Sequence, residues 1–273
     1  MKSYFFRFFL TTGCLLLIIT IFSQVLSIVG NDFDKNYLKV PSQLKEKYDP
    51  EIASIISMQE LKEILNQSIN EKGLLGIEVP IFIDDVVRDK FFHSVAFIEN
   101  KGNWVLSLID FFFPKYLFTT AMDPQEIIKK NHGICNQQAI LFQELVDHFG
   151  FEFASVGINF NDINTFSHFA SAVKVNENWY YFDSNMEPEY DRKDHEILQR
   201  ILSADKEIYK EFYPKYNFEM INQNMIEFRD LNTFPASTGV LVQKISQFLS
   251  NYLWLFFLLL ALFFKNKKKN EIF

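Results

Sequence analysis

The sequence predicts an α+β domain held between two membrane-spanning helices. Three features of the 273 residues support this prediction. Uncharged apolar runs lie near both ends, apolar residues recur at helical spacing between residues 49 and 150, and the period changes to the alternation of strands thereafter. Helices that precede a group of neighbouring strands are typical of the α+β class.

Composition narrows the class of protein. Aromatic residues make up 17% and charged residues 22% of the chain, which is too apolar for disorder. The net charge of −7 argues against a nucleic-acid-binding protein, which normally carries a basic stripe. Two cysteines are too few for a disulfide-stapled scaffold or a multi-cysteine zinc site. We expect neither a metal nor a cofactor.

The first apolar run, residues 8–30, predicts an uncleaved transmembrane anchor. It contains no charged residue and is long enough for a helix that crosses the hydrocarbon core, which takes about 20 residues. A cleaved signal peptide is the alternative, although its apolar region would be shorter. A lipoprotein is disfavoured because Cys14 precedes most of the apolar stretch.

The second apolar run, residues 248–264, predicts another transmembrane helix, with a buried core helix as the weaker alternative. A basic tail, 265–273, follows it, and basic residues also precede the first run. The positive-inside rule therefore places both termini in the cytoplasm and the intervening domain outside it. That domain carries 21 basic and 33 acidic residues, which disfavours its lying on an anionic membrane surface.

Between the spans we expect a tether (31–48), one domain (49–238) and a linker (239–247). Capping residues and apolar spacing predict the helices of the domain. They are expected at 49–70, 84–97, 104–113, 123–130, 135–149 and 194–212. Alternation and a turn at 176–178 predict the strands. They are expected at 151–160, 168–175 and 179–183.

Cys135 is the most reactive candidate because it lies in the first turn of a predicted helix, behind Gly133. The N–H groups and the dipole of a helix start stabilise a thiolate, the nucleophilic form of cysteine. His168 opens one strand and Asp183 ends the next, so a hairpin would bring them together. The carboxylate could then orient the imidazole. An inert buried thiol, a strand histidine and a turn aspartate are the alternatives.

These blocks resemble the transglutaminase-like superfamily. The resemblance rests on Gly-Ile-Cys-Asn-Gln-Gln-Ala, Ser-His-Phe-Ala-Ser-Ala-Val and Asn-Trp-Tyr-Tyr-Phe-Asp, within residues 123–184. It implies a papain-like core with Cys135 as nucleophile, His168 as general base and acid, and Asp183 as the orienting group. The family often has a proline after the aspartate, where this chain has Ser184.

Other residues are weaker candidates. The Cys135 backbone N–H would be one oxyanion donor, and Asn103 or Trp104 a second, unless Trp104 is a core residue. His132 is a rival base. Two further sets of polar residues are not expected to be functional. Gln137 and Gln138 are expected to be solvent-facing or structural. The polar cluster of Asn159, Asn161, Asp162 and Asn164 is expected to be a solvated loop, although it could bind calcium.

The family resemblance implies attack on an amide carbonyl of a peptide or protein through a thioester, as in an amidase, a peptidase or an acyltransferase. The acyl acceptor, water or an amine, and the oligomeric state stay open. The alternative is a catalytically silent module that binds a peptide or protein partner. A two-span scaffolding protein would leave the order of Cys135, His168 and Asp183 unexplained.

Overall fold

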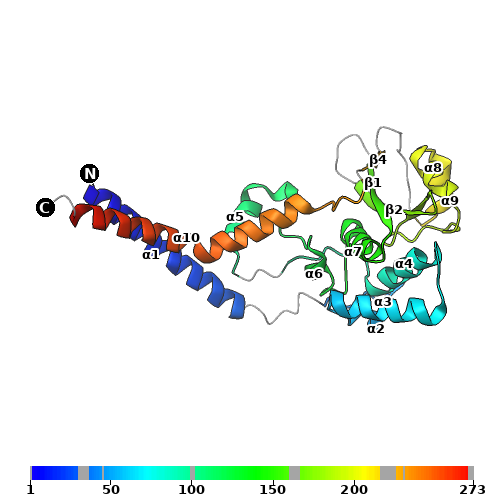
Figure 1. Cartoon of the computed structure of the whole chain (residues 1–273), viewed down its shortest axis with the longest axis horizontal. Helices are drawn as coiled ribbons and strands as arrows, with labels where there is room; N and C mark the ends of the chain where they lie inside the picture. Colours follow the sequence, from blue (N-terminus) through cyan, green and yellow to red (C-terminus); the bar gives the residue numbers. More distant parts are fainter. Residues whose placement is uncertain are drawn as a thin grey trace. The chain divides into compact units, whose positions relative to one another are not determined.

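The computed structural model describes residues 2–29, 37–44, 46–98, 102–159, 167–215, 226–229 and 231–269. The chain divides into two compact units (Figure 1). Unit 1 comprises Met1–Lys35, Phe97–Thr120 and Ser237–Phe273. Unit 2 comprises Asn36–Ala96 and Ala121–Ala236.

Unit 1 contains two long helices, α1 (Lys2–Val29) and α10 (Ser237–Lys269), which pack antiparallel. The Phe9 ring stacks on Phe264 with centroids 5.4 Å apart, and the Thr20 hydroxyl donates to the Ser250 carbonyl at 2.9 Å. A shorter helix, α5 (Trp104–Phe112), and a 3-10 turn, η2 (Pro114–Tyr116), complete the unit. Residues 239–247, expected as a linker, belong to α10.

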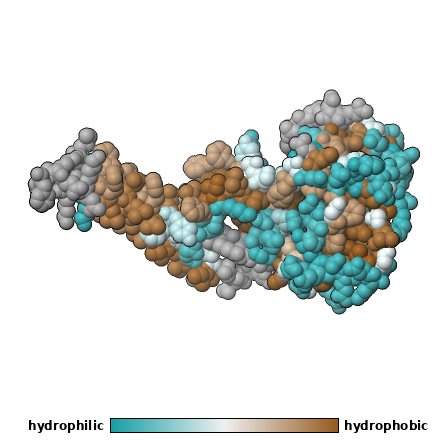
Figure 2. Space-filling model, viewed as in Figure 1, coloured by the Kyte–Doolittle hydropathy of each residue, from teal (hydrophilic) through white to brown (hydrophobic). Residues whose placement is uncertain are grey.

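Both long helices are long and apolar enough to cross a membrane, over Tyr4–Ile28 and Ser237–Lys265. Only 11% of each apolar window is buried. The core helix of a soluble protein would instead be mostly covered by its neighbours, so the core-helix alternative for the second run is disfavoured. Figure 2 shows the apolar side chains of these helices on the surface.

Unit 2 begins with helices, as the sequence predicts. Sequence signals define their ends: Asp49 and Ser57 accept N-terminal N–H groups, and Gly73 ends a helix in the left-handed conformation at φ 63°. The bounds of the helices are α2 Pro50–Ala53, α3 Met58–Lys72, α4 Glu78–Lys90, α6 Pro124–Ile127 and α7 Cys135–His148.

Four antiparallel strands follow in the order β3-β2-β1-β4, which confirms the α+β class. Asn176 and Glu177 both adopt positive φ, at 49° and 67°, and join β2 to β3 in a two-residue hairpin loop. The bounds of the strands are β1 Glu152–Asn159, β2 Ser167–Val175, β3 Asn178–Phe182 and β4 Ile226–Phe228. The short strand β4 was not predicted.

The sheet has a helix layer on each face. Helix α7 packs on β1 and β2, where Gln143 bonds to the hydroxyls of Ser155 and Ser171. Helices α8 (Glu196–Leu202) and α9 (Lys206–Phe212) cover a cluster of buried side chains on the other face. The cluster includes Val156, Ile158, Ala170, Ala172, Ile197, Ile201, Tyr209 and Phe212.

Some predicted boundaries differ from the observed ones. The helix expected over 49–70 is interrupted between α2 and α3, and the helix expected over 84–97 ends at Lys90. The helix expected over 194–212 is two helices, because Ala204 adopts a φ of 57°. Residues 97–120, which we placed in the domain of 49–238, belong to unit 1.

Candidate active site

Cys135 is the first residue of α7, at the position the sequence predicts, and its side chain is half-buried. Ile134 before it is extended, with φ −86° and ψ 173°, so the chain turns into the helix at the cysteine. Backbone N–H groups of a first helical turn point out of the helix and favour a nearby negative charge. The position therefore suits both a thiolate and an oxyanion formed beside it.

Gln137 fixes this turn through four hydrogen bonds from a fully buried side chain. Its Oε1 accepts from the N–H groups of Ile134 (3.1 Å) and Ala96 (3.0 Å). Its Nε2 donates to the carbonyls of Ala96 (2.6 Å) and Ala121 (2.9 Å). Gln138 is buried as well, so of the two interpretations offered by the sequence these glutamines fit the structural one.

His168 and Asp183 lie side by side in the hairpin of β2 and β3. His168 lies near the start of β2 and Asp183 directly follows β3. His168 Nε2 and Asp183 Oδ2 are 2.6 Å apart, and both side chains are almost completely buried. The antiparallel pairing expected from the sequence thus brings the imidazole and the carboxylate into hydrogen-bonding contact.

Cys135 lies next to this pair, close enough for its side chain to help raise the pKa of His168. His168 Nε2 faces Asp183, which leaves Nδ1 as the ring nitrogen available to the thiol. The structure therefore brings together the three residues that the sequence singled out, in the order Cys135, His168, Asp183.

The Asp183 carboxylate accepts four hydrogen bonds. Oδ1 accepts from the backbone N–H groups of Asn185 (3.1 Å) and Met186 (3.0 Å). Oδ2 accepts from the hydroxyl of Tyr213 (2.8 Å) in addition to His168. Four donors in a buried site hold the carboxylate ionised and in one orientation.

The pKa values of this pair move in opposite directions. Burial alone would lower the pKa of His168, but the Asp183 charge and the hydrogen bonds to Asp183 and Cys135 raise it above its ordinary value. Burial alone would raise the pKa of Asp183, but His168 and the other donors lower it. Each partner thus favours the charged form of the other.

Tyr213 and Tyr181 form a second layer behind Asp183 that the sequence did not single out. The two hydroxyls are 2.7 Å apart, and both side chains are fully buried. A signal was present in the sequence, because Tyr209, Phe212 and Tyr213 are spaced as one face of a helix. That spacing predicts burial but does not reveal the bond to Asp183.

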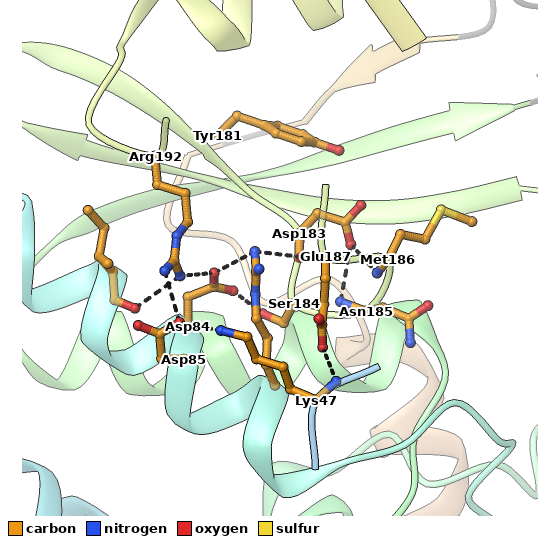
Figure 3. A network of polar contacts seen from close by, with 12 residues as sticks. Lys47, Asp84, Asp85, Tyr181, Asp183, Ser184, Asn185, Met186, Glu187 and Arg192 are labelled. Carbon is orange, nitrogen blue, oxygen red and sulfur yellow. Dashed lines mark hydrogen bonds and ion pairs between the residues drawn. The ribbon is translucent and has the colours of Figure 1, made fainter. Parts of the chain in front are cut away.

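A network of charged side chains, buried at Asp84 and Arg88, holds the chain that carries Asp183 (Figure 3). Arg88 donates to the Asp183 carbonyl at 3.1 Å and pairs with Asp84 at 2.8 Å. Arg192 bridges Asp84 (2.7 Å) and Asp85 (2.9 Å). Burial alone would lower the pKa of Arg88, but Asp84 and further negative neighbours raise it, so the guanidinium stays charged.

Ser184, the departure from the family pattern, belongs to the same network. Its hydroxyl donates to Asp84 Oδ1 at 2.6 Å. Proline has no hydroxyl, so the substitution gives this chain a contact between the residue after Asp183 and helix α4 that proline could not make.

His132, the rival base, has a different environment. Its Nδ1 bonds to Asn131 Oδ1 at 2.9 Å, and its ring packs against Phe92. Burial, aided by the charge of Lys130, lowers the pKa of His132 to about 4. The ring is therefore neutral near pH 7, and we keep His168 as the base.

Asn103 and Trp104 belong to unit 1, and α10 engages their side-chain donors. Asn103 Nδ2 donates to the Ser246 hydroxyl at 3.0 Å, and Trp104 Nε1 to the Ser250 carbonyl at 3.2 Å. We therefore do not carry them forward as oxyanion donors. The backbone N–H of Cys135 remains the candidate.

Within the described ranges, no group of three His, Cys, Asp or Glu side chains could hold a metal ion. The polar cluster around Asp162 lies outside the described residues.

The chain also matches a known protein family. A family model for a transglutaminase-like domain matches residues 35–210, more than half of the chain. The chain belongs to this family. Comparison with curated proteins and with solved structures finds no match. The transglutaminase-like domain thus includes Cys135, His168 and Asp183, together with Asp84, Arg88 and Arg192. Tyr213 follows the matched range.

Proposed function

We propose that this protein is a membrane-anchored cysteine enzyme that attacks an amide carbonyl of a peptide or protein and forms a thioester. The observation that carries the proposal is the buried His168–Asp183 hydrogen bond, with the Cys135 thiol beside His168 at a helix start. A nucleophile, a base and an orienting group in contact are the arrangement that covalent acyl transfer requires. Membership of the transglutaminase-like family supports the same chemistry.

In the first half-reaction the Cys135 thiolate attacks the carbonyl carbon, and a C–S bond forms. The carbonyl electrons move to the oxygen, and the backbone N–H of Cys135 donates to this oxyanion. The oxyanion collapses, the C–N bond breaks, and the His168 imidazolium gives its proton to the departing amine. The products are the free amine and a thioester on Cys135.

In the second half-reaction neutral His168 takes a proton from the acceptor, which is water or an amine. The acceptor attacks the thioester carbonyl, the C–S bond breaks, and the thiolate returns beside the imidazolium. Asp183 fixes the ring so that Nδ1 faces the sulfur throughout. Water yields an amidase or peptidase, and an amine yields an acyltransferase.

We place the transglutaminase-like domain outside the cytoplasm. Basic residues flank both candidate spans on the side of the termini, which supports a cytoplasmic location of both ends. A reporter that is active only in the cytoplasm, fused after Phe273, should be active. A reporter active only outside, fused at the same point, should be silent, and the reverse pattern would overturn this topology.

Alkylation of Cys135 tests the chemistry without a known substrate. The full chain carrying Cys14→Ala retains Cys135 as its one cysteine. We expect iodoacetamide to label this protein at pH 6–7 much faster than it labels a simple free thiol, because the imidazolium stabilises the thiolate. The matched control, Cys135→Ala with Cys14 retained, should lose the fast reaction.

His168→Ala separates the two functional interpretations. If the proposal is right, this variant removes the fast alkylation of Cys135 while the fold persists, as judged by circular dichroism. A wild-type reaction no faster than that of a free thiol, and equal in the His168→Ala variant, would instead favour a silent peptide-binding module.

A further inference from the structure

Helix α5 and the turn that follows it expose a dense set of apolar side chains. Phe111, Phe112 and Phe113 are 76%, 67% and 55% exposed. Leu108, Tyr116 and Leu117 are exposed as well. Contiguous exposed apolar side chains of this size are unusual on a surface that faces only water. Figure 2 shows the hydrophobic colour in the region where Figure 1 places α5 beside α10.

The same segment is electrically neutral. Between residues 104 and 118 the charged residues are Asp110 and Lys115, which have opposite sign. The rest of the sequence between the two apolar runs is strongly acidic. The repulsion that would keep an acidic surface away from anionic lipid therefore does not act on this segment.

Hydrogen bonds fix the segment at one level of α10. At its start, Asn103 bonds to Ser246 and to Ser250 at 3.0 and 2.9 Å. At its end, Gln243 donates to the carbonyls of Phe118 (2.8 Å) and Thr120 (2.7 Å). The helix rise is about 1.5 Å per residue, so residues 243–250 cover roughly 10 Å along α10.

That level includes Lys244, the charged residue that precedes the uncharged part of α10, residues 245–264. Helix α1 is fixed at the same level, because Thr20 also bonds to the Ser250 carbonyl. If α1 and α10 span the bilayer with Lys244 at the level of the head groups, the segment lies where hydrocarbon gives way to head groups. Tryptophan and tyrosine, here Trp104 and Tyr116, are enriched at that depth.

We propose that residues 104–118 form a third membrane-contacting element, which lies in the interface with its aromatic face in the lipid. The partner is the phospholipid bilayer itself. An apolar helix that lies in the interface plane buries its apolar face at the boundary of head groups and acyl chains. The inference rests on the anchoring by α1 and α10 and is independent of the proposed chemistry at Cys135.

A depth measurement in vesicles tests this inference. The full chain carrying Cys14→Ala, Cys135→Ala and Phe112→Cys is labelled with an environment-sensitive fluorophore and reconstituted into phosphatidylcholine vesicles. Lipids with brominated acyl chains then quench the label if it contacts lipid. Phe256→Cys, on the exposed surface of α10, is the positive control, and Leu75→Cys, which is 78% exposed in unit 2, is the matched water-facing control.

We expect brominated lipid to quench the label at Phe112 several-fold more strongly than at Leu75, and aqueous iodide to show the reverse order. Phe111→Cys repeats the test at a second site, so a single misfolded variant does not decide the result. If brominated lipid quenches the label at Phe256 but not at Phe112 or Phe111, which then behave like Leu75, the inference is overturned. The exposed apolar face would then be a binding surface for a protein or peptide. Absence of quenching at Phe256 would overturn it together with the anchoring.

Discussion

The Tyr213 hydroxyl and the His168 ring donate to the same oxygen of Asp183, at 2.8 and 2.6 Å. The tyrosine comes from the end of α9 and the histidine from β2, so two separate elements converge on one carboxylate oxygen. A carboxylate held by both cannot rotate without breaking a buried hydrogen bond. Tyr213 therefore positions His168 through Asp183.

Tyr213→Phe tests this positioning while keeping the aromatic packing. We expect a loss of about 1–2 kcal/mol in the free energy of unfolding and a slower alkylation of Cys135 near pH 7. The control is Tyr209→Phe, which removes another buried hydroxyl, bonded to the Ile201 carbonyl at 3.0 Å. The control should lose similar stability, with alkylation unchanged. Equal alkylation rates in the two variants would contradict the positioning.

Asp183→Asn keeps the size of the side chain and removes its charge. The charge raises the pKa of His168, so that pKa should fall in the variant and the imidazolium should be lost at lower pH. Turnover should drop by about 10²–10⁴-fold, the range for lost general acid–base assistance.

The alkylation rate of Cys135 is measured between pH 5 and 9 in Asp183→Asn and in the wild type. The rate of the variant should fall furthest below that of the wild type at pH 6–7. Asp205→Asn is a matched control, because Asp205 also accepts a backbone N–H two residues on but is exposed at the start of α9. An unchanged pH profile in Asp183→Asn would contradict the proposed coupling.

Gln137→Ala should destabilise the protein by about 2–4 kcal/mol, because it leaves buried backbone groups of Ala96 and Ala121 without their side-chain partner. Alkylation of Cys135 should slow as the turn before α7 loosens. Unfolding in denaturant measures the first effect. Gln67→Ala, on the exposed face of α3, should change neither quantity. A loss of unfolding free energy in Gln137→Ala smaller than the contribution of one ordinary hydrogen bond would contradict the role of Gln137 in fixing this turn.

The lowered pKa of Lys90 predicts that the free energy of unfolding depends on pH. Its ammonium is buried and donates to the carbonyls of Ala53 (3.2 Å) and Ile55 (2.5 Å). Burial lowers the pKa of Lys90 to about 7 from its ordinary value of 10.5. The unfolded chain therefore binds this proton more tightly than the folded chain, and the destabilisation grows as the pH falls from 10.5 towards 7 and then levels off.

Lys90→Met removes that proton site. The advantage of the variant over the wild type should be small near pH 10 and reach a few kcal/mol at pH 6. Melting temperatures of both proteins between pH 6 and 10 measure it. Because His168 titrates in both proteins, their difference isolates Lys90. A difference that does not vary with pH would exclude a depressed Lys90 pKa.

Local signals in the sequence predicted the elements that carry the catalytic candidates. The helix start at Cys135 and the hairpin that pairs the strands of His168 and Asp183 depend on short stretches of chain, where period and turn residues are informative. The two apolar runs were equally visible, because a candidate span is recognised by its length and composition alone.

Contacts between distant segments could not be predicted in this way. The bond from Tyr213 to Asp183 joins residues 30 apart, and the bond from Arg88 to the Asp183 carbonyl joins residues 95 apart. The sequence marked α5 as apolar, but an apolar stripe does not reveal whether its neighbour is the sheet or α10. The hydrogen bonds of Asn103 and Trp104 to α10 are contacts of this kind.

The route of the chain at Ala96 and Ala121 has a structural consequence. The chain departs from unit 2 after Ala96 and re-enters at Ala121, and these two residues are backbone neighbours, with N–H to carbonyl at 2.8 Å. An ordinary tight turn would close the same gap. The backbone pairing of unit 2 is thus continuous across the point where the chain leaves it, so the geometry around the thiol does not depend on the length of the excursion.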